Sequence, residues 1–352
     1  FNDVATDDAV TSNKLDNFLR MATGQWSAMF NPVNQWDNCN SAILYINQFL
    51  NIVDTVQWKW SNSEQQELYR RRFKGEAYAL KGLFEYHLLQ TIGGITADNK
   101  LLGIPHYNTF INVSDNFNIP RATFAESVAQ IYTDFDKALE FLTMDDYVDI
   151  TLPGQLPPGI NPNTLVVNYN AVFGKNSNQR ISGRIVKALK ARLALMVASP
   201  AFSDDDPVLW GKAADYAAIC INGIGGIAGL DPFGHRFYEA ARVDAINLGA
   251  ATPIDQKEIM WRTAINTTNS REKDNYPPSL YGNGRVNPSQ NLVDAFPGLN
   301  GYPISDPKSL YDPGNPYAKR DPRLALYILY DGNKIGSKKI ITGVGGGSDA
   351  KD

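Results

Sequence analysis

The segment from Phe73 to Leu89 has the pattern of a helix with two different stripes. One stripe carries apolar side chains at intervals of three and four residues, which is the spacing of a single helix face. Beside it lie Gly75, Ala79 and Gly82. A glycine inside a helix costs about 1 kcal/mol relative to alanine, so two of them require a compensating contact. We expect close approach of a neighbouring helix, which predicts stacked helical hairpins. The apolar stripe comprises Phe73, Ala77, Leu80, Phe84 and Leu88.

Helix ends are marked by capping residues. Ser63 is the expected N-cap of the helix that contains Phe73, and this helix is expected to end at Gly93-Gly94, because glycine reaches the left-handed conformation of many C-caps. Thr123 with Glu126 predicts a capping box at the start of another helix. Apolar periodicity predicts helices over residues 34–53, 63–90, 123–142, 182–198 and 207–221.

The remaining segments read as loops with few strands. Pro, Gly and Asn are frequent from Pro153 to Gln179 and again after about Leu230, which is typical of irregular structure. Within the second region, alternation predicts a strand over Leu324–Tyr330. Asp331-Gly332 predicts a hairpin turn rather than a calcium loop, because the twelfth position of such a loop is Thr342 instead of glutamate.

Composition excludes some classes of partner. The net charge is -4 and the pI is about 5.5, so no broad basic surface for nucleic acid or anionic lipid is expected. Only 20% of residues are charged, whereas 17 Tyr, 16 Phe and 6 Trp are present. This balance suits uncharged polar ligands such as sugars, and it equally suits a loop-rich extracellular protein. Cys39 and Cys220 fall on separate predicted helices, where buried free thiols are favoured and a disulfide stays open.

Five sequence blocks, in order along the chain, resemble the signature of the SusD/RagB family. The first is the helix around Gly75 and Gly82 with the Gly93-Gly94-Ile95 turn and the later Gly103-Ile104-Pro105. Ile92 departs from the family, in which an aromatic residue usually precedes the two glycines. Members of this family are nutrient-binding lipoproteins on the outer membrane of Bacteroidetes. The other four blocks are Pro120–Phe124, Gly183–Leu195, Asn287–Phe296 and Arg320–Leu324.

The resemblance implies a fold and a location. It implies one SusD-like domain over residues 1–352, mainly α, with tetratricopeptide-like stacked helical pairs over about 7–225. A loop-rich lobe with few short strands is expected over about 226–352. The family's lipid-anchored N-terminus and last third are not found in these residues, so we expect any lipid anchor to lie outside this chain. The expected location is the cell-surface side of the outer membrane, and the expected partner is a SusC-like TonB-dependent transporter.

Few residues suggest catalysis or metal binding. Gly223–Ala228 matches a dinucleotide-binding pattern but follows a predicted helix instead of a strand, so we reject that interpretation. Asp204-Asp205-Asp206 precedes Pro207 at the start of a helix, where acidic residues act as caps. His87, His106 and His235 lack partners at metal-ligand spacing. The sequence therefore predicts no enzyme, no metal site and no cofactor.

Aromatic residues in polar surroundings are the expected ligand-binding residues. An exposed ring offers an apolar face to a sugar, while nearby amides bond its hydroxyls. Trp26, Trp36 and Asn38 are the first candidates, although Trp36 also heads an apolar stripe with Ile43 and Leu50, so a core role is equally open. An ordinary loop is the alternative for the second group, which comprises Tyr276, Tyr281, Asn283 and Arg285.

The resemblance favours capture of oligosaccharides without chemistry, for delivery to the transporter. An oligopeptide-binding subunit of the same kind of transporter is the alternative, because aromatic rings and Asn side chains also suit peptides. A glycoside hydrolase would need two carboxylates about 5–10 Å apart across a cleft. The sequence nominates no such pair.

Overall fold

The computed structural model describes residues 2–27, 29–203, 205–230, 258–262, 268–345 and 347–350. These residues fall into two compact units, one formed by residues 1–34 with 266–352 and the other by residues 35–265. We call them the smaller unit and the helical unit. The sequence predicts a scaffold over about 7–225 and a lobe over about 226–352, whereas the structure groups residues 1–34 with 266–352 and extends the helical unit to residue 265.

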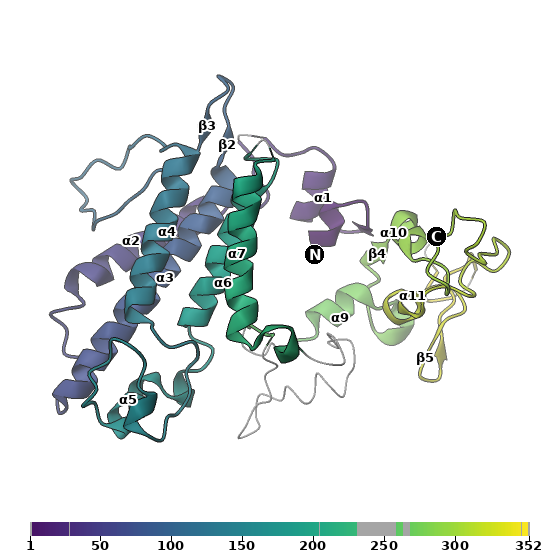
Figure 1. The fold of residues 1–352 in the computed structure, drawn as a ribbon. Coiled ribbons are helices and arrows are strands. Elements are labelled where there is room, and N and C mark those ends of the chain that lie inside the picture. Colours follow the sequence, from purple (N-terminus) through teal and green to yellow (C-terminus); the bar gives the residue numbers. More distant parts are fainter. Residues whose placement is uncertain are drawn as a thin grey trace. The chain divides into compact units, whose positions relative to one another are not determined.

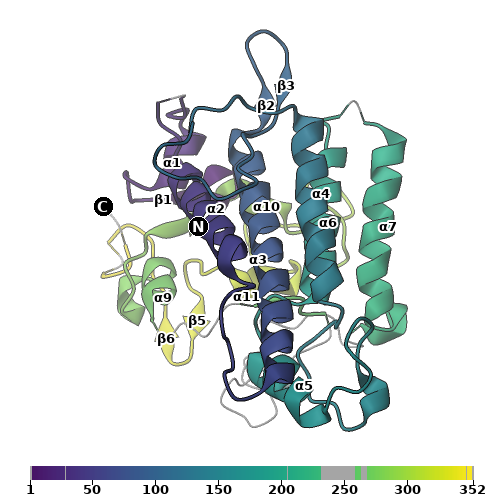
Figure 2. The ribbon, with the colours of Figure 1, turned by 90° about the vertical axis from the view of Figure 1, so that its left-hand side faces the viewer.

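The helical unit is a row of packed helices, as Figures 1 and 2 show. The long helix α3 (Ser63–Ile92) packs against α2 (Trp36–Ile52), α4 (Phe124–Phe141) and the short α5 (Val166–Phe173). The row continues from α4 to α6 (Gly183–Ala198) and from α6 to α7 (Pro207–Gly223). This arrangement confirms the predicted mainly helical fold. The short elements are the β2–β3 hairpin (Gly94–Ile95 with Leu101–Leu102) and the 3₁₀ helices η2 (Pro153–Gln155), η3 (Lys175–Ser177) and η4 (Gly226–Gly229).

Close approach of α4 explains the glycines of α3. A Cβ atom added to Gly75 would lie 2.5 Å from Leu142 Cγ, and one added to Gly82 would lie 2.7 Å from Phe135 Cε1. Both distances are far below van der Waals contact, so only glycine lets these helices approach so closely. Phe135 and Leu142 are themselves almost fully buried. The predicted close approach is confirmed.

Most helix caps follow the sequence, with two corrections. Thr123 and Glu126 form the predicted capping box, and Asp206 caps α7 by accepting from the Val208 N–H. The N-cap of α3 is Asn62 instead of Ser63, since the Asn62 side chain accepts a hydrogen bond from the Gln65 N–H. Gly93 ends α3 in an extended conformation (φ −62°), so the left-handed prediction was wrong for this residue. Glycine is needed there for space, because a Cβ would lie 2.5 Å from the Leu89 carbonyl oxygen.

The smaller unit combines short elements from both ends of the chain. Strand β1 (Ala9–Thr11) pairs antiparallel with β4 (Val286–Pro288), with Ala9 opposite Pro288. A small core of Val293, Leu324 and Ile328 lies among the C-terminal elements. The other elements are η1 (Asn2–Ala5), α1 (Asn17–Ala22), α9 (Ser270–Asn275), η5 (Pro278–Leu280), α10 (Gln290–Ala295), α11 (Pro322–Tyr327), β5 (Lys334–Ile335) and β6 (Lys338–Lys339).

Three local predictions differ from the structure. The strand predicted over Leu324–Tyr330 is wrong, because Asp321 caps the Arg323 N–H and starts helix α11. The excursion from Pro153 to Gln179 is not wholly irregular, since it contains α5. A turn forms at Asp331-Gly332, where the Asn333 N–H donates to the Tyr330 carbonyl oxygen (3.0 Å), but the β5–β6 hairpin is joined at Gly336-Ser337. Asp204 and His235 lie outside the described residues.

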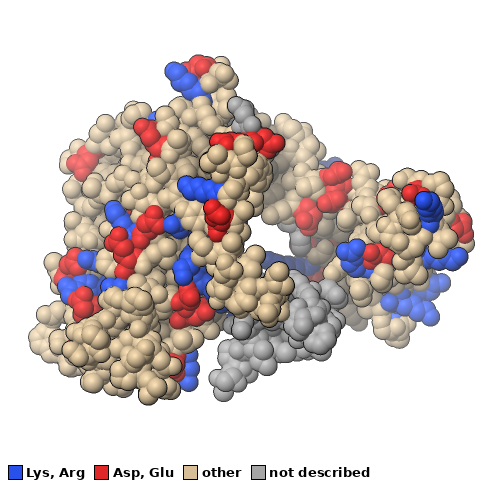
Figure 3. Space-filling view, in the orientation of Figure 1, with Lys and Arg blue, Asp and Glu red and all other residues tan. Residues whose placement is uncertain are grey.

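Cys39 and Cys220 are both free thiols, as favoured from the sequence. Burial raises the pKa of the Cys39 thiol and of the Cys220 thiol above the usual value. None of the described helices combines the length and the apolar character that a membrane span requires. Acidic and basic side chains are interspersed over the face shown in Figure 3, most of which is uncharged.

We expect Gly82→Ala to destabilise the protein by about 1–3 kcal/mol, because the new methyl group would overlap the buried Phe135 ring. Urea unfolding followed by circular dichroism would measure the change. Gly211→Ala on α7 is the matched control: its Cβ meets no atom within 4 Å, so alanine should stabilise that helix by about 0.5–1 kcal/mol. Equal effects of the two substitutions would contradict the close-approach explanation.

Candidate functional site

An open hollow lies between α2 and the loop that joins β3 to α4. It has a volume of about 350 Å³, and we name it the Trp36 hollow. Trp36, Asn40 and Leu44 succeed one another at four-residue spacing on α2, so they share one helix face. The opposite wall comes from the loop, and the full lining is Trp36, Asn40, Ser41, Leu44, Tyr107, Ile111 and Phe117.

Hydrogen bonds hold the loop wall in place. The Tyr107 hydroxyl donates to the Phe117 carbonyl oxygen (2.7 Å), which ties two aromatic residues of the wall together. Asn47 on α2 is 4% exposed, and its Nδ2 donates to the carbonyl oxygens of Tyr107 (2.6 Å) and Thr109 (3.2 Å). A buried amide with two backbone partners fixes the loop against α2. The shape of the Trp36 hollow is therefore built into the fold.

The Trp36 hollow combines aromatic surface with one unsatisfied polar atom. Trp36 and Tyr107 are partly buried and pack against the core, whereas Phe117 is 50% exposed. Asn40 Nδ2 donates to the Trp36 carbonyl oxygen (2.9 Å), while its Oδ1 is buried and has no partner among the described residues. The rings can contact the apolar face of a ligand, whereas the buried Asn40 oxygen is closed to it.

A second and larger hollow lies in the smaller unit. It has a volume of about 810 Å³, and Tyr276 and Asn283 both line it. Tyr281 does not line it: its side chain is 92% exposed and its backbone is left-handed (φ 62°). Arg285 also lies outside the lining, and its guanidinium is 3.3 Å from the Asp274 carboxylate. The structure thus brings together two of the four residues predicted in this loop.

The other predicted residues separate from one another. Trp36 lines its own hollow, and Asn38 is an exposed residue of α2 outside that lining. Trp26 is 48% exposed and belongs to the smaller unit. Sequence reasoning missed Tyr107 and Phe117. The available signal was two aromatic residues in the polar segment that follows Gly103-Ile104-Pro105.

A buried ionic cluster lies beneath α2 and the loop. Lys81 Nζ is 3.1 Å from Asp134 Oδ2 and 3.7 Å from Glu85 Oε1, and it donates to Asn108 Oδ1 (3.0 Å). The side chains of Lys81, Asp134 and Glu85 are 3%, 1% and 1% exposed. Glu85 Oε2 and Asp134 Oδ1 have no hydrogen-bond partner among the described residues. One ammonium thus lies beside two carboxylates at the interface of α3 and α4.

Ser127, His106 and Glu85 follow one another in the order of a hydrolase triad, but the His106–Glu85 contact is no hydrogen bond and the serine is inaccessible. His106 Nε2 is 2.9 Å from Ser127 Oγ, and His106 Nδ1 is 3.4 Å from Glu85 Oε1. Ser127 is fully buried, and its Oγ accepts from the Ile104 N–H (3.1 Å). A nucleophile must reach its substrate, so this arrangement is structural. Within the described ranges, no three His, Cys, Asp or Glu side chains are grouped to hold a metal ion.

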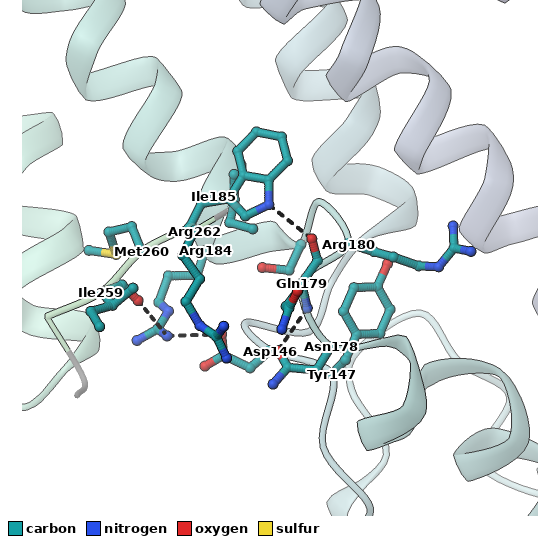
Figure 4. A pocket seen from close by; sticks show the side chains of 12 residues that line it. Asp146, Tyr147, Asn178, Gln179, Arg180, Arg184, Ile185, Ile259, Met260 and Arg262 are labelled. Carbon is teal, nitrogen blue, oxygen red and sulfur yellow. Dashed lines mark hydrogen bonds and ion pairs between the residues drawn. The ribbon is translucent and has the colours of Figure 1, made fainter. Parts of the chain in front are cut away.

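A third hollow, of about 50 Å³, is rich in arginine (Figure 4). Arg184 pairs with Asp146 (3.1 Å), and Arg180 pairs with Glu76 (3.3 Å). Burial raises the pKa of the Glu76 and Asp146 carboxyls, and the neighbouring arginines partly oppose this shift. Trp261 closes one side by donating its indole N–H to the Gln179 carbonyl oxygen (2.9 Å). These charges are matched within the protein, which favours a structural role.

Two family models match the chain. One, described as "Starch-binding associating with outer membrane", matches residues 1–155, and the SusD family model matches residues 255–351. The chain belongs to the SusD/RagB family. No curated protein matches the sequence.

Solved structures of SusD-like proteins share the fold. A SusD-like protein from Bacteroides fragilis matches 95% of this chain and 57% of its own, at 19% identity and a TM-score of 0.62. A SusD-like carbohydrate binding protein from the same organism matches 96% and 54%, at 16% identity and a TM-score of 0.59. A SusD-like carbohydrate binding protein from Bacteroides vulgatus matches 84% and 51%, at 18% identity and a TM-score of 0.51. This SusD/RagB chain spans about half the length of these structures.

We expect Lys81→Met to cost about 3–5 kcal/mol, because it leaves Asp134 and Glu85 buried without their cation. Chemical denaturation would measure the loss. Lys100→Met is the control: Lys100 pairs with Asp98 at 2.7 Å, but both side chains are at least 60% exposed, so no measurable change is expected. A Lys81 variant as stable as the control would show that the buried cluster contributes nothing.

Proposed function

We propose that this SusD/RagB protein binds uncharged oligosaccharides at the cell surface and delivers them to a TonB-dependent transporter in the outer membrane. The observation that carries the proposal is the Trp36 hollow. Its volume of about 350 Å³ lies within the range of known ligand sites, about 300–1,000 Å³. All seven lining residues are uncharged, which favours a neutral ligand.

The chemistry of the Trp36 hollow suits a sugar. The rings of Trp36, Tyr107 and Phe117 offer apolar surface to the C–H face of a sugar ring. Asn40 and Ser41 supply the polar part of the lining. Binding here needs no reacting group, and the triad-like residues at Ser127 are closed to a substrate. Capture without catalysis is the mechanism that we propose.

The comparisons support the ligand class and the location. One family model carries the words "starch-binding" and "outer membrane". Two of the solved relatives are named carbohydrate binding proteins. Delivery to a transporter and attachment by a lipid anchor rest on family membership alone. The ligand roles of Trp26, Asn38, Tyr281 and Arg285 stay predictions.

We expect Trp36→Ala to weaken oligosaccharide binding by about tenfold to a hundredfold, because it removes about 1.5–3 kcal/mol of apolar contact. Isothermal titration of the full-length protein against plant, fungal and bacterial oligosaccharides and mixed oligopeptides would measure it. Trp60→Ala is the matched control, since this tryptophan is 86% exposed and lines none of the three hollows.

A second variant separates binding from folding. Phe117→Ala removes a half-exposed ring of the same hollow, so it should weaken binding even if Trp36→Ala perturbs the core. Tyr276→Ala and Asn283→Ala test the hollow of the smaller unit in the same way. A heat of binding measured with peptides but not with oligosaccharides would replace the glycan proposal by the oligopeptide alternative. Glycan binding unchanged in both Trp36→Ala and Phe117→Ala would remove the Trp36 hollow from the mechanism.

A further inference from the structure

We propose that a second hollow on the helical unit binds a single polyhydroxylated ring, a free monosaccharide. This Lys81 hollow has a volume of about 360 Å³ and is open to solvent on one side. Its walls come from α2, α3, α4 and residues 108–110 of the loop. The inference rests on the proposed function for the ligand class, but it concerns different residues.

The two hollows lie along one face of α2. Trp36, Asn40 and Leu44 line the first, and Asn47 and Asn51 line the second. These five positions follow the three- and four-residue spacing of one helix face. At a rise of 1.5 Å per residue, the centres of the two α2 segments are about 13 Å apart along the helix.

The loop crosses α2 between the hollows, and its residues divide between them. Tyr107 lines the first hollow, whereas Asn108 and Thr109 line the second. The buried Asn47 holds this crossing through the carbonyl oxygens of Tyr107 and Thr109. Both hollows are therefore shaped by the same pinned loop.

A buried carboxylate borders the Lys81 hollow. Asp134 lines the hollow and is 1% exposed. Its Oδ2 accepts a hydrogen bond from Gln130 Nε2 (3.1 Å) and lies 3.1 Å from Lys81 Nζ. Its Oδ1 has no partner among the described residues. This oxygen is not accessible from the hollow, so Asp134 fixes the positions of Lys81 and Gln130, and the exposed side chains of the lining supply the ligand contacts.

The unused polar groups of the lining are of both kinds. Asn108 uses Oδ1 for Lys81 and keeps Nδ2 as a donor, whereas Gln130 uses Nε2 for Asp134 and keeps Oε1 as an acceptor. Asn51 offers both, since its amide makes no hydrogen bond within the described part of the chain. Hydroxyl groups donate and accept, so they match these amides, and the exposed Lys137 ammonium of the same lining adds a further donor.

An aromatic ring completes the Lys81 hollow. Tyr78 lines it together with Leu50 and Phe110, which provide apolar surface. The Tyr78 ring is parallel to that of Phe141 (centroids 6.2 Å apart, planes at 3°), which fixes its plane. Lys137 Nζ lies 5.3 Å from the Tyr78 ring centre. A flat apolar surface beside mixed donors and acceptors is the arrangement that a sugar ring requires.

Saturation-transfer NMR of the full-length protein with glucose, galactose, mannose, xylose and N-acetylglucosamine would test the inference. Thr133 is an exposed residue at the α4 side of the hollow, so Thr133→Tyr should fill the hollow without disturbing the fold. We expect it to abolish the signal, while the near-isosteric Thr133→Val keeps it. Trp36→Ala should also keep it, because that residue lines only the first hollow.

Replacing a polar side chain of the lining by an apolar one provides the second measurement. Asn51→Leu should weaken monosaccharide binding by about tenfold, the effect of losing one or two hydrogen bonds. Gln48→Leu, an exposed neighbour on α2 outside the lining, should leave it unchanged. A signal lost in Trp36→Ala but kept in Thr133→Tyr would overturn this inference and leave the proposed function intact. The absence of a monosaccharide signal with the unaltered protein would also overturn the inference about the Lys81 hollow. The oligosaccharide titration tests the proposed function independently.

Discussion

The close approach of α3 and α4 is the constraint on which the helical unit depends. Gly75 and Gly82 leave room for Leu142 and Phe135, which are almost fully buried. Close packing of this kind has little tolerance for added volume. The same approach brings Lys81 of α3 within 3.1 Å of Asp134 of α4, so an ion pair forms where water is excluded. The glycines therefore determine both the core and the position of its buried charges.

Buried polar side chains then shape the surface. Asn47 ties the loop after β3 to α2, and Lys81 ties the same loop to α3 through Asn108. Buried amides and charges with several partners are costly to misplace, so they hold one arrangement of the loop. The Trp36 and Lys81 hollows lie on either side of this loop. Their shape follows from packing beneath them, and the exposed side chains supply the chemistry.

Connectivity alone does not define a site in this protein. Ser127, His106 and Glu85 lie in the order of a hydrolase triad, yet the serine is fully buried and its Oγ accepts from a backbone N–H. The Trp36 hollow contains no such linked set, but its aromatic rings face open space. Accessibility separates the two cases: a buried network stabilises the fold, whereas the open aromatic surface beside Asn40 and Ser41 can contact a ligand. Family membership agrees with the second role.

The sequence by itself determined the helices of the scaffold, the capping box at Thr123, the glycine contacts of α3 and the SusD/RagB family, because local spacing and motif order carry this information. The alternating pattern of Leu324–Tyr330 predicted a strand, but the N-cap at Asp321 starts a helix there. The sequence also named Trp36 but missed Tyr107 and Phe117. Only the tertiary structure brought that loop to α2, since the Asn47 hydrogen bonds span about sixty residues. Contacts between distant segments leave no periodic signal, so the hollows could not be derived from the sequence.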